Sequence, residues 1–256
     1  MILTVDIGNS NIMLGGFVAD ELVFVSRLST QTKQTEDEYS IRILEALRLH
    51  HVDASQITGI IVASVVPPLN AAIGKAMRFV FEKDPIFIGP GIKSGIGIQC
   101  DIPSSVGADL IAAAVGAYYI YESPALIIDM GTATKMTVVN EKGAFIGTSI
   151  IPGVWMGLNA LADGTAQLPK ISLGVPNTVI AKNTADCMRS GVLFGNACLI
   201  DGMIDRMVAE FGKDLNLYAT GGMASTVIPL CRHKIFVDEH LVLKGLNILY
   251  EKNKKN

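Results

Sequence analysis

The chain has 256 residues, of which half are apolar, and a net charge of −3. It is long enough to bury a substantial core, but its charge gives no global attraction to nucleic acid or to an anionic membrane. Asp6 interrupts the stretch where a secretory signal would be apolar, and no apolar run approaches the roughly 18 residues of a membrane span. The four cysteines form no CxxC pair and the four histidines lie at no metal-ligand spacing. We therefore expect a cytoplasmic protein with reduced thiols, no structural zinc, and neither nucleic acid nor membrane as a partner.

The first stretch of the chain, ILTVDIGNSNIMLGGFV at residues 2–18, is typical of a β-hairpin. Asp6 follows a run of apolar residues, and Gly8 allows the backbone to turn tightly. Main-chain N–H groups and the Ser10 hydroxyl can then face phosphate oxygens, while the carboxylate at the strand end can hold a cation. A single Asp-x-Gly sequence is more often a structural turn and nothing more.

The same pattern occurs a second time, as ALIIDMGTATKMTVV beginning at Ala125. Its aspartate, Asp129, lies about half a chain after Asp6, which is too long a period for a solenoid. Two copies at this distance predict two homologous half-domains, residues 1–122 and 123–256, facing each other across a cleft.

The remainder of the first half alternates strands with helices. We expect strands at 22–28, 58–66 and 85–88 and helices at 35–49 and 69–82. Thr35 and Glu38 form a capping box at the start of the first helix. The residues expected on its buried face are Tyr39, Ile43, Leu44 and Leu47. The nearly continuous apolar run at 58–66 predicts a strand buried on both faces of a sheet, so the half-domain is of the α/β class with a mixed sheet.

The segment at 89–109 is too rich in glycine for a regular element and suits a loop that wraps a ligand. It contains neither G-x-G-x-x-G nor G-x-x-x-x-G-K-[ST], so it predicts neither a Rossmann nor a P-loop site. Ser104 or Ser105 can cap a helix over 106–120, which places Asp109 in the first turn. One interpretation is that Asp109 only complements the helix dipole. Against it, Asp109 is the sole charge of that apolar helix.

The second half continues with strands at 144–151 and 215–219 and helices at 154–162, 185–211 and 240–250. Two glycines leave open a break around 191–195, and Thr184 could act only as a helix cap. We expect Trp155 in the core or in a subunit contact. Gly221 and Gly222 directly follow a buried strand, where missing side chains could let a flat ligand such as adenine lie over the backbone.

Six motifs together resemble the type III pantothenate kinases, which belong to the superfamily of acetate and sugar kinases, heat-shock protein 70 and actin. They are DIGNSN at 6–11, GPGIKSGI at 89–96, GAD at 107–109, DMGTAT at 129–134, KNT at 182–184 and TGG at 220–222. The resemblance implies a duplicated actin-like ATPase fold, with two half-domains of mixed sheets flanked by helices around a nucleotide cleft. It also implies ATP-dependent phosphorylation of pantothenate to 4′-phosphopantothenate, the first step of coenzyme A biosynthesis, by a cytoplasmic homodimer.

The resemblance carries roles over to individual positions. Asp109 would take the proton from the primary hydroxyl of the substrate, Asp6 would help to hold Mg²⁺, and Asp129 would bind a monovalent cation, K⁺ or NH₄⁺. The implied ATP-binding residues are Asp6, Ile7, Gly8, Asn9, Ser10, Asn11, Ile12, Met13 and Thr132, to which the glycine argument adds Gly221 and Gly222. The implied pantothenate-binding residues are Cys100, Gly107, Ala108, Asp109, Leu110 and Thr184.

Two positions depart from the family pattern. Leu110 stands where the family usually has an arginine, and Cys100 stands where it usually has a tyrosine that borders the substrate. Loss of a charge-assisted contact of about 1.5–3 kcal/mol to the carboxylate of pantothenate weakens binding. Two other functions therefore stay open: a catalytically weak paralogue that acts as a ligand-binding regulatory or accessory protein, and a kinase for another small primary alcohol.

Overall fold

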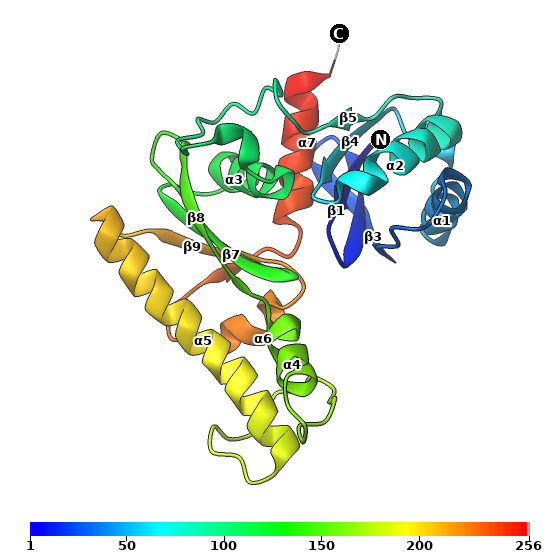
Figure 1. Ribbon diagram of the computed structural model, residues 1–256. Helices are drawn as coiled ribbons and strands as arrows, with labels where there is room; N and C mark the ends of the chain where they lie inside the picture. Colours follow the sequence, from blue (N-terminus) through cyan, green and yellow to red (C-terminus); the bar gives the residue numbers. More distant parts are fainter. Residues whose placement is uncertain (255–256) are drawn as a thin grey trace. The chain divides into compact units, whose positions relative to one another are not determined.

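The computed structural model describes residues 1–254, and these form two compact units. The first unit combines Met1–Tyr121 with the C-terminal segment that begins at Leu241, and the second is Glu122–His240. Each unit contains one five-stranded mixed sheet flanked by helices (Figure 1). The strand orders are β3-β2-β1-β4-β5 and β8-β7-β6-β9-β10, so the two sheets have the same topology and the predicted duplication of the hairpin is confirmed.

The first unit is built on the hairpin that opens the chain. Its strands are β1 (Ile2–Ile7), β2 (Asn11–Val18), β3 (Glu21–Ser29), β4 (Gly59–Ser64) and β5 (Ile86–Phe87). Its helices are α1 (Glu36–Leu49), α2 (Pro67–Phe81), α3 (Ala108–Ile120) and α7 (Leu241–Asn253), with short 3₁₀ turns at Ala54–Gln56 and Pro103–Ser105. β1 pairs antiparallel with β2 and parallel with β4, which makes the sheet mixed.

Strand β4 is buried on both faces, as its apolar run predicts. Ile60 and Val62 join one hydrophobic cluster with residues of α1 and α2, whereas Ile61 and Ala63 join another with residues of α3 and α7. Successive side chains of a strand point to opposite faces, so this division places helices on both sides of the sheet.

Helix α1 begins as predicted but buries a slightly different face. The Thr35 N–H donates to Glu38 Oε2 (2.8 Å) and the Glu38 N–H donates to Thr35 Oγ1 (3.4 Å), which confirms the capping box. The expectation that Leu44 is buried is wrong, because its side chain is 42% exposed. Ala46 is buried in its place, since the buried stripe follows the 3.6-residue helical period toward α2.

Helix α7 packs in the first unit, although residues 241–253 fall within the second half-domain expected at 123–256. Figure 1 shows α7 beside α3 and close to β1 and β4. A Cβ atom at Gly245 would collide with the carbonyl oxygen of Ala112, and one at Gly116 would lie 2.8 Å from the carbonyl oxygen of Leu241. Two glycines thus let the α3 and α7 backbones touch, and this contact between distant segments returns the chain end to the first unit.

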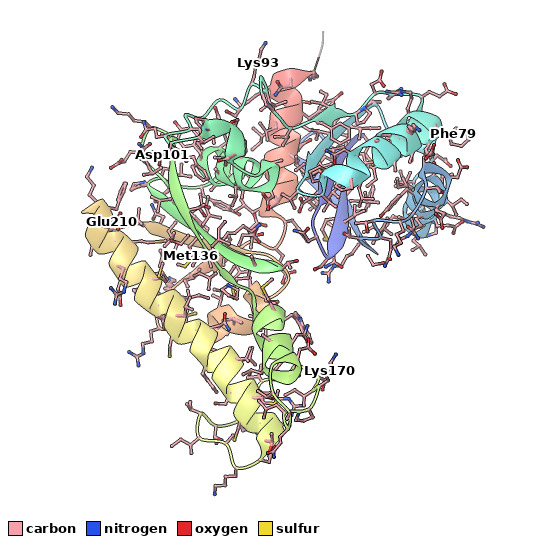
Figure 2. All side chains as sticks on the ribbon, viewed as in Figure 1. Phe79, Lys93, Asp101, Met136, Lys170 and Glu210 are labelled. Carbon is pink, nitrogen blue, oxygen red and sulfur yellow. The ribbon has the colours of Figure 1, made fainter. Side chains whose placement is uncertain are left out.

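The second unit repeats the arrangement. Its strands are β6 (Ala125–Met130), β7 (Ala133–Val139), β8 (Phe145–Pro152), β9 (Asn216–Thr220) and β10 (Phe236–Val237). Its helices are α4 (Val154–Asp163), α5 (Thr184–Phe211) and the short α6 (Ala224–Val227), which a 3₁₀ turn at Ile228–Leu230 follows. One face of the sheet, including Leu126, Ile128 and Met136, packs on α4 and α5 in a single hydrophobic cluster. Figure 2 labels Met136 on β7.

Helix α5 is continuous over 28 residues, so no break occurs at 191–195. A Cβ atom at Gly191 or Gly195 would meet no atom within 4 Å, so both glycines sit in an ordinary helix with open space around them. The cap is Asn183, whose side chain accepts the Asp186 N–H at 3.0 Å, and Thr184 is the first helical residue. Among residues 1–254, no helix is both long enough and apolar enough to cross a membrane.

Candidate functional site

The first phosphate-type turn joins β1 to β2. Asp6 is the last residue but one of β1 and lies between Met13 of β2 and Ala63 of β4 in the sheet register. The Gly8 N–H donates to the Asn11 carbonyl (2.9 Å), which closes the turn. Asn9, Ser10 and Asn11 are exposed. The turn therefore presents polar groups beside a strand-end carboxylate, which is the arrangement that the sequence predicts.

A residue outside the predicted set, Thr30, holds this turn in place. Its hydroxyl donates to the Gly8 carbonyl (2.6 Å), and its N–H donates to the Ser10 carbonyl (3.0 Å). Two of the residues carried over as ATP-binding, Ile7 and Ile12, have side chains that are 0% and 2% exposed in the core. At these two positions only the backbone is placed to meet a ligand.

Asp109 lies in the first turn of α3, as predicted, and is only 9% exposed. Its Oδ1 accepts the N–H of Leu110 at 2.8 Å. The residue that caps the helix is Gly107 and not the expected Ser104 or Ser105. Ser105 ends a separate 3₁₀ turn, where its hydroxyl donates to the Ile102 carbonyl (2.7 Å). A Cβ atom at Gly107 would lie 2.5 Å from Asp109 Oδ1. The missing side chain of Gly107 thus leaves room for the carboxylate.

The two positions that depart from the family pattern lie near Asp109 in the sequence. Leu110 is 6% exposed, so its side chain fills a buried position. Cys100 is half-buried, and burial, with a smaller contribution from the charge of Asp101, raises the pKa of its thiol. Figure 2 labels Asp101 in the segment before α3. Neither side chain can form a charged contact with a carboxylate at neutral pH.

In the second unit, Asp129 occupies the position in β6 that Asp6 occupies in β1. Its cross-strand partner in the hairpin is Lys135, and its neighbour in β9 is Thr220. The Lys135 Nζ atom lies 2.7 Å from Asp129 Oδ2, and the two side chains are 16% and 13% exposed. The carboxylate expected to bind a monovalent cation therefore forms an ion pair with an ammonium group of the same hairpin.

The turn that carries Thr132 is packed between two glycines. A Cβ atom at Gly153 would collide with the carbonyl oxygen of Thr132. A Cβ atom at Gly221, whose φ is +90°, would lie 2.6–2.7 Å from the backbone of Met130. Gly221 thus makes room for protein backbone, whereas Gly222 has open space around its Cβ position and is exposed. Of the two glycines proposed to accommodate adenine, only Gly222 leaves that space open.

The KNT motif lines an open depression of about 600 Å³ on the surface of the second unit. Leu161, Leu168 and Met188 supply its apolar wall, and Lys182, Asn183 and Thr184 supply its polar side. Thr184, predicted to border pantothenate, is exposed at this wall. This depression thus combines apolar surface with the exposed Lys182 side chain.

A family model described as type III pantothenate kinase matches residues 2–206. The chain belongs to the type III pantothenate kinase family. Two relatives named type III pantothenate kinase, from Geotalea daltonii and Geobacter sulfurreducens, are each 40% identical to it over 256 and 255 residues, covering 100% of both chains. The six motifs and the full-length similarity therefore indicate the same family.

Solved structures show the same fold at low identity. A conserved Baf family protein from Campylobacter jejuni shares 19% identity over 98% of both chains, with a TM-score of 0.62. Component A of the (R)-2-hydroxyglutaryl-CoA dehydratase from Acidaminococcus fermentans shares 14% identity over 97% of this chain and 96% of its own, with a TM-score of 0.59. With the two mixed sheets, these similarities confirm the predicted α/β fold of the actin-like ATPase and sugar kinase type.

The donor groups fit one of the two ions that were expected from the resemblance, Mg²⁺ and a monovalent cation. Mg²⁺ in kinases is held by one or two carboxylates together with substrate phosphates, so the single carboxylate of Asp6 beside the Gly8 turn suits it. Residues 1–254 contain no cluster of three or more His, Cys, Asp or Glu side chains that could hold a metal. A monovalent cation does not fit at Asp129, because the Lys135 ammonium lies against that carboxylate.

The motifs did not reveal Thr30, Lys135 or Gly153. Lys135 could have been found from the hairpin register, since a turn centred on residues 131 and 132 places it opposite Asp129. Thr30 and Gly153 carry no comparable local signal, because their contacts join segments that are distant in the sequence.

Proposed function

We propose that this chain transfers the γ-phosphoryl group of ATP to the primary hydroxyl of pantothenate and so supplies 4′-phosphopantothenate for coenzyme A biosynthesis. The observation that carries the proposal is the Asp109 carboxylate, which is buried at the first turn of α3 in a chain that the type III pantothenate kinase model matches over residues 2–206. The Leu110 N–H and the space left by Gly107 hold this carboxylate in position.

In this proposal Asp109 takes the proton of the substrate hydroxyl as the hydroxyl oxygen bonds to the γ-phosphorus. The bond between that phosphorus and the bridging oxygen breaks, and ADP leaves. Phosphoryl transfer depends mainly on positioning and charge stabilisation, so a carboxylate held by a backbone N–H is a sufficient base.

The turns at Gly8–Asn11 and at Thr132 are proposed to face the phosphates of ATP, because both present polar groups at the end of a central strand. Asp6, together with the phosphates, would hold Mg²⁺, which would supply charge neutralisation when bound. Gly222 and the exposed Thr184 are proposed to border the nucleotide and pantothenate respectively. We do not extend the proposal to a potassium or ammonium ion, since Asp129 is already paired.

A cytoplasmic homodimer also belongs to the proposal. Its support is a set of exposed apolar side chains on β8 and α4, namely Ile150 (68% exposed), Trp155 (47%) and Met156 (46%). Sedimentation velocity should give a dimer, and Trp155→Glu should shift it toward monomer. A monomeric parent protein would contradict this part of the proposal.

The testing experiment is a coupled ADP-release assay with Mg²⁺-ATP, with and without pantothenate. We expect pantothenate-dependent turnover that Asp109→Asn abolishes while its melting temperature stays close to that of the parent. ADP release that remains at background with pantothenate would refute the proposed function.

The weak-paralogue alternative is favoured by one observation, the uncharged Leu110 and Cys100 where the family has arginine and tyrosine. Leu110→Arg combined with Cys100→Tyr distinguishes the possibilities in the same assay. A large gain in turnover marks a weakened pantothenate site. No gain, together with turnover on another small primary alcohol, identifies a different substrate.

A further inference from the structure

The ion pair between Lys135 and Asp129 is built into the second hairpin. The two residues are direct cross-strand partners, so their side chains lie on the same face of the sheet. Met136, the next residue, is 0% exposed and packs in the cluster formed with α4 and α5, which places Lys135 on the opposite face. The register of the strands therefore holds the ammonium at Asp129.

Burial distinguishes this pair from an ordinary surface contact. The Lys135 and Asp129 side chains are 16% and 13% exposed, whereas those of Lys213 and Glu141, another pair in this unit, are 68% and 42% exposed. A charge removed from water needs a partner of opposite sign, so the two charges of the Lys135–Asp129 pair stabilise each other.

The duplicated hairpin supplies an internal comparison. Asp6 holds the equivalent place in the first unit, but its cross-strand partner is Met13. The carboxylate implied to act through Mg²⁺ thus has an uncharged side chain opposite it, while the carboxylate implied to bind a monovalent cation has a lysine.

We propose that the Lys135 ammonium takes the place of the monovalent cation at Asp129, so that this chain works without potassium or ammonium ions. A lysine head group carries the same single positive charge as K⁺ or NH₄⁺ and is a compact donor. With Nζ 2.7 Å from Oδ2, a second cation at that oxygen would meet direct charge repulsion. The expectation of turnover without potassium or ammonium rests on the proposed function. The expectation that Lys135 keeps a cation away from Asp129 does not.

The test compares the parent protein with Lys135→Met, which keeps an unbranched side chain one atom shorter than lysine and removes the charge. Thermal melting with Mg²⁺-ATP and ADP release with pantothenate are measured in potassium chloride and in choline chloride at equal ionic strength. The matched control is Lys213→Met, which removes a lysine from an exposed pair in the same unit.

The parent and Lys213→Met should give the same melting temperature and turnover in both salts. Lys135→Met should melt about 2–4 °C higher in potassium than in choline, because potassium binds the uncovered carboxylate. A parent that loses at least about tenfold in turnover without potassium would overturn the inference, as would a Lys135→Met variant indifferent to the salt.

If Lys135→Met does not fold, Lys135→Gln takes its place, and the salt dependence of the parent still decides the inference. Failure of the proposed function gives a different result: no turnover with pantothenate in either salt, with the melting comparison unaffected.

Discussion

The substitution Gly107→Ala should separate the position of the catalytic carboxylate from the stability of the fold. The backbone at Gly107 has φ −58° and ψ 142°, a conformation that alanine adopts without strain. The added Cβ would lie 2.5 Å from Asp109 Oδ1, and ordinary contact begins at 3.4 Å. The carboxylate oxygen therefore has to withdraw by about 0.9 Å, and it is the same oxygen that accepts the Leu110 N–H.

The magnitude follows from this movement. A displacement of about 1 Å in a catalytic group can cost roughly 10²-fold in rate, so we expect kcat to fall by that order. The change in stability should be small, because two effects oppose each other. Alanine is a weaker helix cap than glycine, which destabilises the fold. Alanine also reduces the entropy of the unfolded chain, which stabilises the fold. These opposing contributions should leave the free energy of unfolding within about 1 kcal/mol of the parent value.

The assay is steady-state ADP release together with a thermal melt of each variant. Gly191→Ala on α5 is the matched control, because its added Cβ meets no atom within 4 Å and should leave kcat unchanged. A Gly107→Ala variant with parental kcat would refute the reasoning that the position of Asp109 controls the rate. A variant that loses both kcat and its folded structure would show that Gly107 acts through the fold.

Three further predictions concern other parts of the chain. Thr30→Val removes the hydroxyl bonded to the Gly8 carbonyl, so the Michaelis constant for ATP should rise several-fold, with a loss of about 1 kcal/mol in unfolding free energy; steady-state kinetics and denaturant titration measure both. Gly245→Ala forces a Cβ onto the Ala112 carbonyl and should lower the free energy of unfolding by about 1–3 kcal/mol, measured as a lower melting temperature. An unchanged melting temperature would contradict the close contact of α3 and α7. Burial raises the pKa of the Cys231 thiol to about 12, so at pH 8 mass spectrometry should find it alkylated last among the four cysteines.

Much of the fold could be predicted from local patterns. The two hairpins, the capping box at Thr35 and the doubly buried strand β4 follow from apolar periodicity and turn residues, and the structure agrees with each. The place of α7 could not be predicted, because it depends on Gly116 and Gly245 bringing two distant helices into backbone contact. No pattern within either helix encodes that partner.

In the candidate site, too, local sequence predicted some features, whereas contacts between distant segments could not be predicted. The motifs placed Asp109 in the first turn of α3 and Asp6 and Asp129 at equivalent strand ends, since each depends on nearby sequence. They did not indicate that Gly221 makes room for the Met130 backbone, because that contact links the ends of β6 and β9, two parallel strands that are distant in the sequence. The packing role of a glycine cannot be predicted from the sequence until the backbone that lies against it is known.

The reaction proposed for this chain is the phosphorylation of pantothenate by ATP. The most direct measurement incubates the protein with pantothenate and ATP labelled in the γ-phosphate, separates the products, and identifies the labelled species by mass spectrometry. We expect label on 4′-phosphopantothenate with the parent protein and no labelled 4′-phosphopantothenate with Asp109→Asn. Label found only in ATP and inorganic phosphate, from a protein shown to be folded, would contradict it.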